Sequence, residues 1–240
     1  MKRIAIILIA SLLSFEGFSN FDKGQILNVI APSGLRMRVS PQVGKTIKII
    51  PYGASLTVLE EDKIIEDRVE WVTGNWIKVS YDGDTGYVFD GFLSDFPAPQ
   101  SMFEKNEFEM DLIYPVEAWV ENRLMGTYHK PDTILLSNGK HRTVQHFTDG
   151  KFIKEDKKHM YKVELHLTNT RIMDVYQILQ AMFDDKYKRN TFNTRSIFIK
   201  DENGDIDNIK IQLDDLVTIR RMSPDHIRLR ILSSESGCAL

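Results

Sequence analysis

Residues 25–96 contain six short runs of β-branched or alternating apolar residues, separated by turns built from Gly, Pro and Asp. Short runs with a period of two predict strands rather than helices. Asp82-Gly83, between two such runs, is a strong signal for a tight hairpin. Six strands in so short a segment bury a core most readily by closing on themselves. The segment therefore predicts a small all-β barrel.

The same segment resembles the bacterial SH3 (SH3b) family. The residues that carry the resemblance are GLRMRVSPQVGKTIKIIPYGASLTVLEE (34–61) and GNWIKVSYDGDTGYVFDGFLS (74–94). The chain departs from the family pattern at Met37, where Val is usual, and in an insertion, DKIIEDRVEWVTG, before Trp76. The resemblance implies an SH3-like barrel that binds cell-wall peptides or positions a neighbouring domain.

Aromatic residues gather near the end of this segment. Alternation along WIKVSY places Ile77 and Val79 in the barrel core, and alternation along GYVF places Val88 there. The aromatic neighbours of these residues then point outward, where several rings in one place would form a binding surface. We predict a ligand groove lined by Tyr52, Trp76, Tyr87, Phe89 and Phe92. The alternative is that a second domain covers this surface.

The chain begins with the pattern of a secretory signal peptide. A basic start, MKR, precedes an apolar run at 4–13 that is too short to span a bilayer, and small residues at Gly17 and Ser19 define a cleavage site. We expect residues 1–19 to be removed, which leaves Asn20 first. The mature protein is then extracytoplasmic, periplasmic or secreted, and not an integral membrane protein. With Cys238 as its only cysteine, it has no internal disulfide.

The rest of the chain predicts an α+β domain rich in antiparallel strands, with one main amphipathic helix. YKVELHL (161–167) alternates as a strand, and apolar residues from Ile172 to Phe183 recur at helical spacing, with Thr170 as the expected N-cap. Further hairpins are expected at 138–139, 203–204 and 223–225. The predicted organisation is a linker at 97–101 made irregular by Pro97 and Pro99, this domain at 102–232 and a disordered tail at 233–240.

Several motifs suggest other chemistry, but none completes it. DENGDID (201–207) begins like a calcium loop, yet Ile206 occupies the position that requires Gly, so a solvated hairpin turn is favoured. The six histidines form no metal-binding motif, and no catalytic cysteine or Gly-x-Ser-x-Gly sequence is present. We therefore expect no catalytic residues, metal or cofactor. A net charge of −3 also argues against nucleic acid as a partner.

These features predict a non-catalytic binding protein of the bacterial cell envelope. The expected partner is a cell-wall peptide or an envelope protein, bound in the aromatic groove. Two alternatives remain open. One is an envelope hydrolase with its catalytic residues in 102–240, and the other is a structural protein whose barrel docks its own second domain.

Overall fold

The computed structural model describes residues 21–60, 65–69, 72–99, 112–124, 132–136, 141–157, 160–183 and 186–234. The predicted signal peptide, the hairpin turn at 138–139 and Cys238 lie outside these residues.

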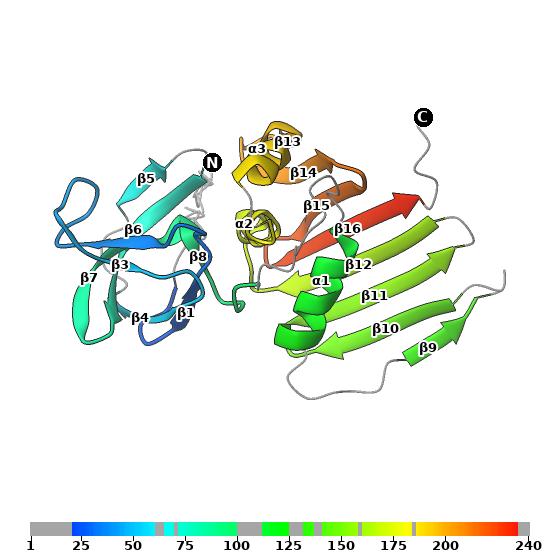
Figure 1. The fold of residues 1–240 in the computed structure, drawn as a ribbon, viewed down its shortest axis with the longest axis horizontal. Coiled ribbons are helices and arrows are strands. Elements are labelled where there is room, and N and C mark those ends of the chain that lie inside the picture. The colour runs from blue at the N-terminus through cyan, green and yellow to red at the C-terminus, as the bar shows by residue number, and fades with distance from the viewer. Residues whose placement is uncertain are drawn as a thin grey trace, which may run out of the picture.

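The N-terminal part forms the predicted all-β barrel (Figure 1). Its strands are β1 (Ile26–Val29), β2 (Leu35–Arg38), β3 (Thr46–Ile50), β4 (Ser55–Glu60), β5 (Glu66–Val69), β6 (Val72–Tyr81), β7 (Asp84–Phe89) and β8 (Leu93–Ser94). They follow the order β3-β2-β7-β6-β4-β1-β8, and β5 pairs with β6. Between β6 and β7, Asp82 and Gly83 have φ values of 50° and 78°, as the hairpin signal requires.

The period-two prediction for the barrel core is confirmed. Val79 and Val88 are fully buried in the barrel cluster, and Ile77 packs against it. Met37, which replaces the usual Val, is also fully buried there. An unbranched, flexible side chain can fill an irregular space in a core, so this departure leaves the barrel intact.

The C-terminal part is an antiparallel eight-stranded sheet in the order β13-β14-β15-β16-β12-β11-β10-β9. The strands are β9 (Asp132–Leu135), β10 (His141–Phe147), β11 (Gly150–Lys157), β12 (Met160–Thr168), β13 (Ser196–Lys200), β14 (Ile206–Gln212), β15 (Leu216–Ser223) and β16 (His226–Ser234). Helices α1 (Ile113–Trp119), α2 (Ile172–Ala181) and α3 (Lys186–Thr194) accompany it, and a π-helical turn, η2 (Val120–Leu124), follows α1. Figure 1 shows α2 between the barrel and the sheet.

The predicted amphipathic helix is α2, and its apolar residues are buried. Its N-cap is Arg171 rather than Thr170, because Asp174 accepts a hydrogen bond from the Arg171 backbone N–H at 3.3 Å. Helices α1 and α3 were not predicted. Pro115 weakens the local helix signal of α1, although a helix tolerates proline in its first turn. Helix α3 contributes only Phe192 to the core.

The core of the C-terminal domain includes residues from the barrel side of the chain. Ile30, which follows β1, and Phe96 and Ala98, which follow β8, are buried in the same cluster as the sheet and α2. The predicted linker is therefore packed into this core at Ala98, which is 5% exposed. The Trp119 indole N–H also donates to the Pro97 carbonyl at 2.9 Å. The segment that follows β8 is therefore held against the C-terminal domain.

Strand β16 includes Ser233 and Ser234, which pair with Tyr161 and Met160, so the tail does not begin at 233 as predicted. Within the described residues, no helix is long and apolar enough to cross a membrane.

Candidate functional site

The predicted groove residues lie mostly on the hairpin formed by β6 and β7. Trp76 and Phe89 are cross-strand partners and face away from the barrel core, as the alternation predicted. With Val72 they form a separate buried group, here called the aromatic cluster. Half-buried side chains complete it: Ile65, Val69, Tyr87, Phe92 and Met173.

Trp76 is covered by the insertion that precedes it in sequence. The indole is 6% exposed, and its N–H donates to Asp67 Oδ2 at 2.8 Å. Asp67 lies on β5, the strand contributed by the insertion, and the Arg38 guanidinium lies 5.8 Å from the centre of the indole ring. The sequence departure from the family pattern thus supplies the cover for this ring.

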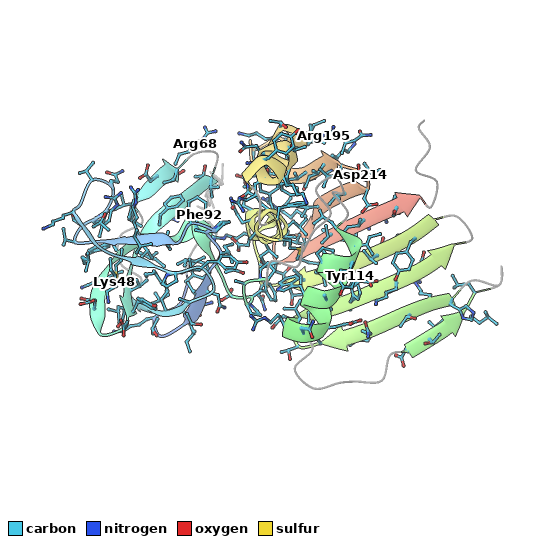
Figure 2. The ribbon with its side chains drawn as sticks, in the orientation of Figure 1. Lys48, Arg68, Phe92, Tyr114, Arg195 and Asp214 are labelled. Atoms are coloured by element: carbon cyan, nitrogen blue, oxygen red, sulfur yellow. The ribbon has the colours of Figure 1, made fainter. Side chains whose placement is uncertain are left out.

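Phe89 is buried even more completely, at 2% exposure. Its ring centre lies 6.1 Å from that of Trp76 and 5.7 Å from that of Phe92. The ring also packs over Gly91, where an added Cβ would lie 2.4 Å from Phe89 Cε1. Met173 of α2 packs against this group, and Figure 2 shows Phe92 on the side of the barrel that faces α2.

Tyr52 lies apart from the other four predicted residues. It packs against the C-terminal core, and its hydroxyl donates a hydrogen bond to the Pro99 carbonyl. Burial raises the pKa of this hydroxyl above its usual value, so Tyr52 is protonated and can donate at neutral pH. Its role in this structure is to tie the end of the barrel segment to the second domain.

The prediction of five exposed groove aromatics is therefore wrong for Trp76 and Phe89, which are buried. Alternation correctly gave the direction of these side chains, but it contains no information on what another segment lays over them. Tyr87 remains half-buried, beside Arg38 of β2 and Lys78 of β6. Whether this set binds a ligand stays a prediction.

A buried ionic contact joins the two domains next to the aromatic cluster. Asp90 is fully buried, and its Oδ1 accepts a hydrogen bond from the Asn75 backbone N–H at 2.6 Å. From the N-cap of α2, Arg171 places Nη1 3.4 Å from Asp90 Oδ2 and donates from Nη2 to the Asp90 carbonyl at 3.1 Å. Arg171 also pairs with Asp174, with Nη2 and Oδ1 2.8 Å apart.

The electrostatics of this contact favour a charged guanidinium. Burial alone lowers the pKa of Arg171, but Asp174 and Asp90 outweigh it, and the pKa is raised. No sequence signal marked this pair, because Asp90 and Arg171 are far apart along the chain and the Asp90-Gly91 dipeptide reads as an ordinary turn.

A small pocket of about 90 Å³ lies where β6 meets α2 and α3. Its lining is mainly apolar side chains and amides: Val72, Met173, Tyr176, Gln177, Gln180, Asn193 and Phe198. The Tyr176 hydroxyl donates to Asn193 Oδ1 at 2.8 Å, and burial raises the pKa of Tyr176 to about 12. The lining offers neither a carboxylate nor a nucleophile activated by a base.

The sequence predicts no metal site among the residues that the structure describes. They hold no group of three or more His, Cys, Asp and Glu side chains suited to a metal ion. In the turn that resembles a calcium loop, Asp201 Oδ1 accepts hydrogen bonds from the backbone N–H groups of Asn203 and Asp205 at 2.9 and 3.0 Å. The turn is closed by its own backbone, as the hairpin interpretation predicted.

Comparison with known proteins identifies only the barrel. Residues 33–94 match the family model described as the bacterial SH3 domain, so this part of the chain is a bacterial SH3 domain. The match covers both stretches that carried the resemblance. No curated protein matches the chain. No solved structure matches it either.

Proposed function

We propose that the protein is an exported, non-catalytic binding protein of the bacterial cell envelope, whose SH3 barrel binds a cell-wall peptide. The observation that carries the proposal is the family match at residues 33–94. The apolar run and cleavage pattern at the start of the chain support the extracytoplasmic location.

The part of the predicted groove that contacts the ligand in this proposal is the half-buried Tyr87 with its two cationic neighbours. Arg38 and Lys78 occupy the cross-strand positions on either side of it, on β2 and β6. A half-exposed ring between two cations suits a peptide that carries a carboxylate beside an apolar group. Trp76 and Phe89 support this surface from below rather than contacting the ligand.

Sedimentation of the full-length mature protein with purified peptidoglycan tests the proposal. The wild type should pellet with the polymer, and Tyr87→Ala should remain in the supernatant. Tyr114→Ala removes a ring that is 63% exposed on α1 and serves as the control, which should pellet as the wild type does. Lys78→Gln tests the same surface without truncating a half-buried ring. Failure of the wild type to pellet, or pelleting of both surface variants, contradicts the proposal.

A second candidate function is supported by the contact between Asp90 and Arg171. In this interpretation the barrel positions the C-terminal domain, and the aromatic side of the barrel serves as the docking surface. This docking role is favoured by the packing of Met173 against the aromatic cluster and by the hydrogen bond from Tyr52 to Pro99. Normal envelope localisation with no peptidoglycan binding by the wild type would select this function over the first. Release of soluble fragments from peptidoglycan would instead select the hydrolase alternative.

A further inference from the structure

The face of the C-terminal sheet that points away from its core carries an unusual arrangement of charge. Along β12, Val163, Leu165 and Leu167 point into the core cluster that also contains the buried residues of α1, α2 and α3. Glu164 and His166 point to the opposite face. No described helix contributes to a cluster on that face, so its character is set by the outward residues of the strands.

In one part of this outer face, carboxylates and cations form ion pairs. Arg142 Nε lies 2.9 Å from Glu155 Oε1, and Lys162 Nζ lies 2.7 Å from Glu155 Oε2. Arg230 Nε lies 2.7 Å from Glu164 Oε1. His166, Arg230 and Lys162 together lower the pKa of Glu164 to about 2, against the effect of burial. We call this alternating arrangement across β10, β11, β12 and β16 the ion-pair ladder.

The next row of cross-strand partners lacks such ion pairs. His146 pairs with Lys151, Lys151 with His166, His166 with Arg228, and Arg228 with Arg220. These five residues, one on each of β10, β11, β12, β16 and β15, form the cationic row. Four inter-strand steps of about 4.8 Å give it a length of roughly 19 Å. No aspartate or glutamate occupies this row in the register of the described strands.

The charge of the row adds to the effect of burial on a neighbouring histidine. His226 Nε2 lies 3.0 Å from His166 Nδ1. Burial, followed by the nearby His166, Lys151 and Arg228, lowers the pKa of His226, and Asp225 only partly opposes them. On its other side, His166 Nε2 is buried without a hydrogen-bond partner, and Glu164 Oε2 is 3.8 Å away. Lys151, Arg228 and Arg220 carry the fixed positive charge of the row, and positive groups placed this close together are stabilised when an anion binds among them.

We propose that the cationic row binds a linear polyanion bearing phosphate groups, laid across the strands of the C-terminal sheet. This surface lies in the second domain, so the inference goes beyond peptide binding by the barrel and does not depend on it. The adjacent Arg220 and Arg228 present two planar guanidinium groups, which match phosphate oxygens with paired hydrogen bonds. Arg220 and His146, at the two ends of the row, are exposed.

The shape of the row selects a flexible polymer over a compact anion or a lipid surface. A single phosphate reaches only two neighbouring members, because the five residues are arranged in a line. Adjacent strands rotate by roughly 20–25°, so the outward direction turns by about 80–100° over the four steps. A flat anionic bilayer can meet only part of such a row, whereas a polymer can follow it along its whole length.

The proposal is tested with the full-length protein and long-chain inorganic polyphosphate as the probe. Binding is measured by fluorescence anisotropy of end-labelled polymer over a range of salt concentrations. The variant Arg220→Gln/Arg228→Gln should bind at least about tenfold more weakly. The logarithm of the association constant decreases linearly with the logarithm of salt concentration. The magnitude of this slope should be smaller by roughly 1.4 in the variant, for two lost phosphate contacts.

The matched control is Arg36→Gln/Lys45→Gln, which removes the same charge from exposed positions of the barrel. It should bind polyphosphate as the wild type does. Equal weakening in both double variants would mean attraction to overall charge and would overturn the proposal. So would wild-type protein that fails to bind polyphosphate, or that binds anionic lipid vesicles as tightly as the polymer. Arg220→Glu, at an exposed position, repeats the test if the double variant folds poorly.

Discussion

At the scale of the residue, Trp76 is a structural side chain. Its indole is 6% exposed, bonds to Asp67 and contacts Phe89. Truncation to alanine leaves a cavity and removes the indole donor from Asp67, so Trp76→Ala should lower the free energy of unfolding by about 3–5 kcal/mol. For a chain of this size the thermal midpoint should fall by about 10 °C. Calorimetry measures both quantities.

Tyr114→Ala is the control for this measurement, because Tyr114 is exposed. Exposed substitutions of this kind typically change stability by less than about 0.5 kcal/mol. An unchanged midpoint for Trp76→Ala, together with loss of peptidoglycan binding, would show instead that Trp76 is a ligand anchor.

Glu164 gives a prediction about pH. Its folded pKa of about 2 lies below the ordinary value of 4.5, so its contribution to stability is present above pH 4.5. That contribution is lost as the pH falls through 4.5 toward 2. Glu164→Gln should therefore destabilise the protein at neutral pH, by roughly 1–3 kcal/mol, and flatten the decline below pH 4.5. Urea unfolding at a series of pH values measures the difference between variant and wild type, which should narrow in acid.

A suitable control is Asp205→Asn, which removes a carboxylate from an exposed turn. It should leave the acid decline unchanged. A constant difference between Glu164→Gln and the wild type at every pH would contradict the predicted coupling.

At the scale of the element, the hairpin β6–β7 contains two glycines with different physical roles. Gly83 has φ of 78° in the turn and open space around it, so Gly83→Ala should cost only about 1 kcal/mol of backbone strain. At Gly86 an added Cβ would lie 2.7 Å from the Arg38 carbonyl oxygen, which belongs to the backbone of β2. Gly86→Ala must push β2 away from β7.

The expected cost of Gly86→Ala is roughly 2–3 kcal/mol, larger than that of Gly83→Ala three residues away. Urea unfolding measures the loss of stability in both variants, provided that their m-values equal that of the wild type. Equal losses would indicate that β2 adjusts without resistance, and a larger loss at Gly83 would contradict the assignment of the close approach.

The strands were more predictable than the surfaces they form. Alternation and turn chemistry are local, so the barrel, its core residues and α2 could be predicted from neighbouring residues alone. The cover over Trp76, the pairing of Asp90 with Arg171 and the cationic row depend on residues distant in sequence. No local pattern brings His146 or Arg220 into the same row, because only the strand order β15-β16-β12-β11-β10 does so.

Helices α1 and α3 were missed for a related reason. A local preference identifies a helix when one of its faces is clearly apolar, as in α2. In α3 the sequence KYKRNTFNT is mostly polar, and packing of Phe192 against Tyr176 and Phe183 holds it in place. Tertiary contact thus overrides a weak local signal.

At the scale of the whole molecule, Arg171 should couple the unfolding of the two domains. Replacing it with methionine leaves Asp90 and Asp174 buried without their cation, a change that typically costs 3–5 kcal/mol. Arg171→Met should therefore lower the midpoint and separate one calorimetric transition into two. Arg171→Lys keeps the charge but loses the planar fork, so it should give an intermediate result.

Arg195→Met provides the comparison, because Arg195 is exposed and bonds only weakly, to the Gln212 carbonyl at 3.4 Å. It should leave a single transition near the wild-type midpoint. Two transitions already present in the wild type would contradict coupling through Arg171.

The shared core limits how the barrel can be moved into another protein. Ile30, Phe96 and Ala98 flank or interrupt the barrel in sequence but are buried with the C-terminal sheet. A transfer that moved the barrel alone would carry these side chains into water and leave holes in the domain left behind. A graft that keeps this core intact must therefore carry the barrel together with the sheet, although the family match covers residues 33–94 alone.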